Sequence, residues 1–213
     1  MKALLLLMVT IGVAAAAPGQ QNLIPNCDFS AKEALQSWRI DFPYQSQYVE
    51  NAQYCRVTTQ LGRKCLEIST PPIVIANQGG KMETALIPAV GGASYHAEVD
   101  CLGWDYNVKV FVEAYTTDPR PDGYQGHSLF VIPGTNGAPC KVMCWRGQFT
   151  DLPHYGALKT WSTATRDFTL PATVKVAGKE CKPEWLTLKV VVWAASAIQG
   201  KSFFTNFRLY RTQ

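Results

Sequence analysis

This sequence of 213 residues has few long apolar segments and no block of like charges. Only residues 3–13 form an apolar run, and no other stretch approaches the roughly 18 apolar residues that a membrane-spanning helix needs. The formal net charge is +4, from 20 Lys and Arg against 16 Asp and Glu, and the two signs are interspersed. We therefore expect a protein that neither inserts into a membrane nor binds nucleic acid.

Recognisable catalytic and metal-binding motifs are missing as well. The chain has no G-x-S-x-G, H-E-x-x-H, G-x-G-x-x-G or phosphate-loop pattern. It has no C-x-x-C pair, and its three histidines (His96, His127 and His154) are scattered, so we expect no zinc. Catalysis is therefore not indicated, although Glu98 and Glu113 leave a glycosidase-like carboxylate pair open, with solvated sheet charges as the alternative.

The start of the chain has the features of a secretory signal peptide. Lys2 precedes the apolar run, alanines occupy residues 14–17, and Pro18 then ends any helix. We therefore expect residues 1–17 to be removed and residues 18–213 to form a single domain, in a secreted or periplasmic protein. We therefore expect no separate catalytic domain beside it.

Seven cysteines favour disulfides in an exported chain. Cys55 and Cys65 could clamp a hairpin, and Cys140 and Cys144 could close a loop, but the pairing cannot be deduced from the sequence. The odd cysteine either stays free or links two chains into a disulfide-bonded dimer.

Alternation of apolar and polar residues dominates the chain, whereas helical periodicity is confined to residues 30–38, where Ser30 could cap one or two turns. Turn sequences such as residues 133–139 separate the alternating segments. The pattern predicts an all-β fold, a two-sheet antiparallel sandwich with at most one short helix near the N-terminus. The residues expected on the apolar faces are Tyr95, Ala97, Val99 and Cys101; Val108, Val110, Val112 and Ala114; Leu186, Leu188, Val190, Val192 and Ala194; and Phe203, Thr205, Phe207 and Leu209.

Four segments in sequence order resemble the jelly-roll carbohydrate-binding modules, the calcium-binding β-sandwiches of the galactose-binding-like superfamily. Residues 22–40 (NLIPNCDF, leading to a Trp) are similar to the opening of these modules, and residues 79–115 to their central pair of strands. Residues 159–171 match a W-x6-F-x2-P pattern, and residues 200–211 are similar to the closing strand. The resemblance implies a jelly-roll β-sandwich that binds carbohydrate, although one fold can host several functions.

The resemblance also implies a structural calcium, held in part by a Glu after the first Phe and by an Asp in the last strand. The matching positions here are Ser30 and Thr205, which carry no charge, whereas calcium prefers carboxylate oxygens. Asp28 and Asn206 stand nearby but make a weak site, so we expect neither calcium nor another cofactor. Cys27 replaces the usual Gly, and a disulfide from it could tie down the last strand instead.

A sugar-binding site needs aromatic rings for the C–H faces of the sugar and polar groups around their edges. The face opposite the apolar one offers three rings if its strands share a sheet, and the turn at residues 104–106 offers two more. The alternative is that these rings form a second core. Arg146 could hold a sugar carboxylate through its planar fork or form a surface ion pair. The candidate ligand-binding residues are Trp104, Asp105, Tyr106, Phe111, Glu113, Tyr115 and Trp193.

The sequence therefore predicts a secreted, non-catalytic protein that binds poly- or oligosaccharide by aromatic stacking and hydrogen bonds. A structural or protein-interaction domain on the same scaffold is one alternative. A jelly-roll polysaccharide lyase or hydrolase is the other.

Overall fold

The computed structural model describes residues 21–40, 54–70, 80–103, 107–117, 129–131, 140–149, 160–193 and 200–213. These residues form strands and turns with no α-helix among them, so this part of the chain has no helix that could cross a membrane. The segment for which the sequence allowed a short helix consists of consecutive turns. In this segment, the backbone N–H of Gln36 donates to the backbone carbonyl of Glu33 at 2.8 Å, and the backbone N–H of Trp38 donates to that of Leu35 at 2.9 Å.

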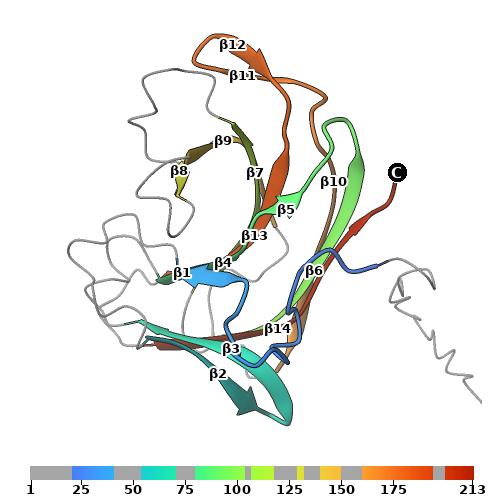
Figure 1. The fold of residues 1–213 in the computed structure, drawn as a ribbon. Helices are drawn as coiled ribbons and strands as arrows, with labels where there is room; N and C mark the ends of the chain where they lie inside the picture. The colour runs from blue at the N-terminus through green and yellow to red at the C-terminus, as the bar shows by residue number, and fades with distance from the viewer. Residues whose placement is uncertain are drawn as a thin grey trace, which may run out of the picture.

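Two antiparallel sheets pack face to face, which confirms the predicted all-β sandwich (Figure 1). Sheet A has the strand order β1 (Trp38–Ile40), β4 (Gly80–Thr84), β13 (Trp185–Trp193), β7 (Asn107–Thr117), β9 (Cys140–Gln148) and β8 (Leu129–Val131), with β5 (Ile87–Pro88) also paired to β13. Sheet B has the order β10 (Ser162–Thr169), β6 (Ser94–Gly103), β14 (Gly200–Arg211), β3 (Arg63–Thr70) and β2 (Cys55–Gln60). Strands β11 (Val174–Val176) and β12 (Lys179–Cys181) form a separate hairpin.

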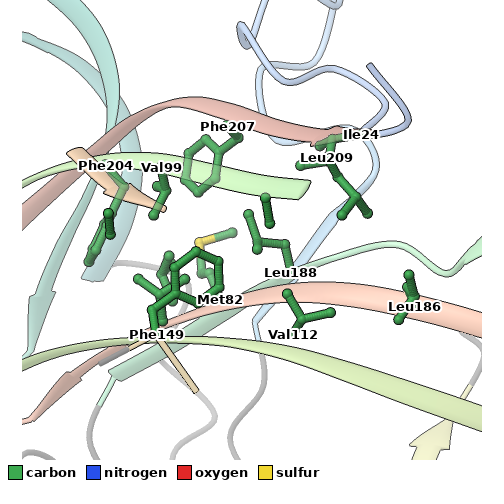
Figure 2. Packing of buried hydrophobic residues seen from close by; sticks show 14 of the residues in the cluster. Ile24, Met82, Val99, Val112, Phe149, Leu186, Leu188, Phe204, Phe207 and Leu209 are labelled. Atoms are coloured by element: carbon green, nitrogen blue, oxygen red, sulfur yellow. The ribbon is translucent and has the colours of Figure 1, made fainter. Parts of the chain in front are cut away.

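The core lies between the inner faces of the two sheets, where Val99, Phe204 and Leu209 of sheet B meet Val112 and Leu188 of sheet A (Figure 2). The predicted apolar positions of β6, β7 and β13 within the described residues are all buried there. At roughly 25 cal/mol per Å² of apolar surface removed from water, this layer is the main source of stability. The outer face of each sheet is left for polar side chains.

The prediction for the last strand is wrong in part. Phe204, Phe207 and Leu209 point into the core, whereas Phe203 lies outside it with Leu102 and Trp161. The pairing of β14 with β6 shifts register between Thr205 and Arg208, and Asn206 there has a φ of 54°. Because a bulge inserts an extra residue, the inward and outward positions exchange along the strand.

The N-terminal segment is tied to β14 by hydrogen bonds rather than by the disulfide proposed for Cys27, whose thiol is free. The Asn22 side-chain amide donates to the Phe207 carbonyl at 2.8 Å, and its oxygen accepts from the Leu209 amide at 3.0 Å. Phe29, from the same segment, packs with its ring centroid 5.9 Å from that of Phe207. The segment therefore closes one side of the core.

The predicted disulfide pairs are also wrong. Cys55 lies opposite Ile68 and Cys65 opposite Thr58, so the two cysteines are three residue pairs apart along the hairpin. Cys144 is free as well, which rules out its proposed bond to Cys140. Burial raises the pKa of the Cys55 thiol to about 12 and that of Cys65 to about 11. These thiols behave as small apolar side chains.

Candidate functional site on the outer face of sheet A

The candidate site lies on the outer face of sheet A, which points away from the core. The sheet is curved so that its edge strands β1 and β8 lie on the same side of the central strands, and the outer face is therefore concave (Figure 1). Alternate residues of β4, β13, β7 and β9 point to this face. They form cross-strand rows, which are Lys81, Val191 and Lys109; Glu83, Lys189, Phe111 and Gln148; Thr187, Glu113 and Arg146; and Trp185, Tyr115 and Met143.

Lys189, on the central strand β13, joins two buried carboxylates. Its Nζ donates to Oε2 of Glu113 at 2.5 Å and lies 3.3 Å from Oε2 of Glu83. The side chains of Glu83 and Glu113 are 0% and 1% exposed, and that of Lys189 is 8% exposed. Arg39 of β1 pairs with Glu83, and the Thr187 hydroxyl donates to the same carboxylate at 3.3 Å. One ionic network therefore links β1, β4, β13 and β7.

Glu113 extends this network to a fifth strand, β9. Arg146 donates to its Oε1 from Nε at 2.7 Å and pairs with it through Nη2 at 2.6 Å, and the Tyr115 hydroxyl donates to its Oε2 at 2.8 Å. Burial alone would raise the pKa of the Glu113 carboxyl. Lys189, Arg146 and Tyr115 together outweigh burial and hold that pKa below its ordinary value. Glu113 is therefore ionised at neutral pH and acts as an anchor for cations.

Aromatic rings with cations beside them lie at two places on this face. The Arg146 guanidinium carbon is 5.1 Å from the centroid of the Phe111 ring, and Lys141 Nζ is 5.6 Å from that of Trp185. Both distances lie within the range of cation–π interactions. Phe111 and Trp185 are partly exposed, whereas Tyr115 is buried. Among the described side chains of this face, the accessible rings are thus Phe111 and Trp185.

The structure brings three of the predicted ligand-binding residues together on one strand, β7, next to β13 as expected. They are Phe111, Glu113 and Tyr115. The backbone of Trp193 lies at the end of β13, and its side chain is outside the described residues, as are residues 104–106. Sequence reasoning missed Trp185 and Lys141. The alternation within residues 140–148 was a usable signal, but a register shift next to Tyr115 interrupts it.

The suggested carboxylate pair of Glu98 and Glu113 does not exist. Glu98 lies on β6 of sheet B, where it pairs with Arg208 at 3.0 Å, and Glu113 lies on the outer face of the other sheet. The core therefore separates the two groups. Glu83 and Glu113 are close, since both contact Lys189, but the lowered pKa of Glu113 is opposite to the raised pKa that a general acid requires.

The residues at the position implied for calcium do not fit a calcium ion. The Lys64 ammonium donates to the Phe29 carbonyl there, and the Thr205 hydroxyl donates to the Lys64 carbonyl at 2.7 Å. Lys64 also lines an adjacent hollow of about 510 Å³ with Asp28 and Asn206. Across the part of the chain that the structure describes, no group of three or more His, Cys, Asp or Glu residues could hold a metal. A lysine already supplies the positive charge that links the N-terminal segment to sheet B.

Comparisons with known structures show that this fold is similar to that of a carbohydrate-binding module and to part of a glycoside hydrolase. A CBM4 structure superposes with a TM-score of 0.50 at 12% sequence identity, covering 89% of this chain and 99% of that one. An arabinose-bound GH51 α-L-arabinofuranosidase also gives a TM-score of 0.50, at 11% identity, over 89% of this chain and 26% of that one. No protein-family model matches the sequence, and no curated protein matches it significantly. The chain therefore has the jelly-roll fold of carbohydrate-binding modules, as its sequence motifs predicted.

Proposed function

We propose that this protein is an exported, non-catalytic carbohydrate-binding protein whose site is the concave outer face of sheet A. The observation that carries the proposal is the pairing of partly exposed rings with fixed polar groups on that face. Phe111 lies beside Arg146, and Trp185 lies beside Lys141. A ring can cover the C–H face of a sugar while the neighbouring cation donates hydrogen bonds to its hydroxyls.

The state of the carboxylates supports binding over hydrolysis. Glycosidases need one carboxyl with a raised pKa to protonate the leaving group. Glu113 has a lowered pKa, and both Glu113 and Glu83 are occupied by cations. Their chemistry suits holding Arg146 and Lys189 in place.

Affinity gel electrophoresis on a panel of plant, algal and microbial polysaccharides tests the proposal. We expect at least one polymer to retard the protein and Phe111→Ala to abolish the retardation. Trp161→Ala is the matched control, because Trp161 immediately precedes β10 of sheet B and Arg63 lies 5.3 Å from its ring centroid. Circular dichroism checks that both variants fold. If no polymer retards the folded protein, or if both variants lose binding equally, this face is not a sugar-binding site.

A further inference from the structure

Among the described residues, the outer face of sheet A carries more positive than negative charge. They include six cations and three carboxylates: Glu83 and Glu113 on the strands, and Glu184, whose Oε2 accepts from the Thr117 hydroxyl that Lys141 also contacts. On the outer face of sheet B, by contrast, ion pairs join Arg56 and Lys201 to Glu67, Arg63 to Asp100, and Arg208 to Glu98, while Asp167 contacts His96, so that these four cations stand against four carboxylates. Among the described residues, the excess of positive charge therefore lies on the candidate site. Its six cations are Arg39, Lys81, Lys109, Lys141, Arg146 and Lys189.

The two signs also lie at different depths. The carboxylates of Glu83 and Glu113 are at the base of the face, at 0% and 1% exposure, whereas the side chain of Arg146 is 49% exposed. A ligand on this face therefore meets cations before these two carboxylates. Because Glu113 holds Arg146 from below, this half-exposed charge is held in place before a ligand arrives.

Arg146 is held in an orientation suited to a carboxylate. Its Nε and Nη2 both contact Oε1 of Glu113, and the guanidinium lies beside the ring of Phe111. A guanidinium is a planar fork with five N–H donors, and fixing it reduces the entropy lost on binding. The ring and the fork together can meet the C–H face and the acidic group of one sugar.

A second cation–ring pair repeats this arrangement along the strands. Phe111 lies opposite Lys189 on β13, and Trp185 lies four residues from Lys189 along the same strand. At roughly 3.4 Å per residue, the positions of the two rings are therefore about 14 Å apart along the strands. Lys141 lies beside the Trp185 ring, as Arg146 lies beside the Phe111 ring. Two such pairs in line suit a polymer that carries acidic groups at intervals.

We infer that the carbohydrate bound on this face is a polyanionic one, a polysaccharide rich in uronic acids, with Arg146 as the residue that selects its carboxylates. This inference rests on the proposed function and specifies its ligand class. Neutral glycans lack the group that a fixed, half-exposed guanidinium is placed to bind, and leaving its remaining N–H donors without a charged partner when a ligand covers them costs affinity.

Paired polymers that differ only in charge test the inference. Affinity gel electrophoresis of the full protein compares polygalacturonate with its methyl ester, and glucuronoxylan with its carboxyl-reduced form, at physiological ionic strength. We expect the acidic member of at least one pair to bind about tenfold or more tightly than its neutral partner, equivalent to about 1.4 kcal/mol. Arg146→Ala should remove that preference. Arg63→Ala should keep it, since Arg63 is equally exposed, pairs with the buried Asp100 and lies over a ring on sheet B.

The outcomes separate the inference from the function that it specifies. Equal binding to acidic and neutral members, abolished by Phe111→Ala, would leave a sugar-binding face but overturn its acidic preference. Loss of acidic binding in Arg63→Ala to the same extent as in Arg146→Ala would mean that net charge alone attracts the polymers, and would overturn the inference as well. Absence of binding to any polymer would overturn both.

Discussion

Replacing Lys189 by Met is expected to destabilise the protein strongly, because it leaves two buried carboxylates without their shared cation. Glu83 and Glu113 are 0% and 1% exposed, and Lys189 Nζ lies within 3.3 Å of both. Removing one partner of a buried ion pair typically costs 3–5 kcal/mol. For a domain of this size, about 2–4 °C per kcal/mol corresponds to a melting temperature lowered by roughly 6–20 °C.

Urea and thermal unfolding followed by circular dichroism measure this cost. Lys201→Met is the matched control, because Lys201 is 51% exposed and pairs with Glu67 at 3.3 Å on the outer face of sheet B. Exposed ion pairs contribute about 0–1 kcal/mol, so the control should change stability little. A second replacement, Glu113→Gln in the Lys189→Met background, should restore part of the loss by removing one of the two buried carboxylates that Lys189 neutralises.

The pH dependence gives an independent check with a defined sign. The folded-state pKa of Glu113 is lowered, so its ionic contacts contribute stability above its unfolded pKa of about 4.3 and lose it as the pH falls through the folded value. The stability gap between the wild type and Lys189→Met should therefore narrow below about pH 4.3. If Lys189→Met costs no more than Lys201→Met at pH 7, the reasoning about the buried network is refuted.

Two further predictions concern sheet B and the N-terminal segment. Lys64→Met should lower the melting temperature, whereas calcium or a chelator should leave that of the wild type unchanged; a large drop on chelation would show that a metal binds after all. His96 lies 2.7 Å from Asp167 and 3.0 Å from Glu98; burial alone would lower its pKa, but these two carboxylates raise it. Protonated His96 should therefore stabilise the protein below its unfolded pKa of about 6.5, and this stability should be lost as the pH rises through the folded pKa. His96→Gln should make the free energy of unfolding depend less on pH, when unfolding is measured from pH 5 to 9.

The inner faces of β6, β7 and β13 could be predicted from sequence because their alternation is regular over each strand. The same reasoning failed in β14, where a bulge at Asn206 exchanges the two faces. No composition signal marks that bulge, because the residue with positive φ is an Asn within a strand-like run. The number of cysteines led to an expectation of disulfides that the structure does not show among the described residues. A count of cysteines does not distinguish a disulfide from a small buried side chain such as Cys55.

The candidate site was predictable along one strand and not across strands. Alternation placed Phe111, Glu113 and Tyr115 on one face of β7. What those residues do depends on their neighbours, and the strand order β4, β13, β7, β9 brings Lys189 and Arg146 to Glu113. These contacts join residues that are 76 and 33 positions apart in the sequence. The structure thus changes Glu113 and Tyr115 from expected sugar contacts into residues that position a cation.

The buried ionic network on sheet A contributes less to stability than apolar residues of similar volume often would. Sheet B also places buried carboxylates beneath exposed arginines, as where Arg56, at 63% exposure, contacts Glu67, at 5% exposure, at 3.0 Å. On sheet A the arginine in addition lies beside the partly exposed ring of Phe111. A fixed anion below a half-exposed guanidinium holds the fork beside Phe111, and it prevents the arginine from folding back onto the sheet. The same anion leaves the cation only partly neutralised, so that a second carboxylate, arriving on a sugar, completes the pairing.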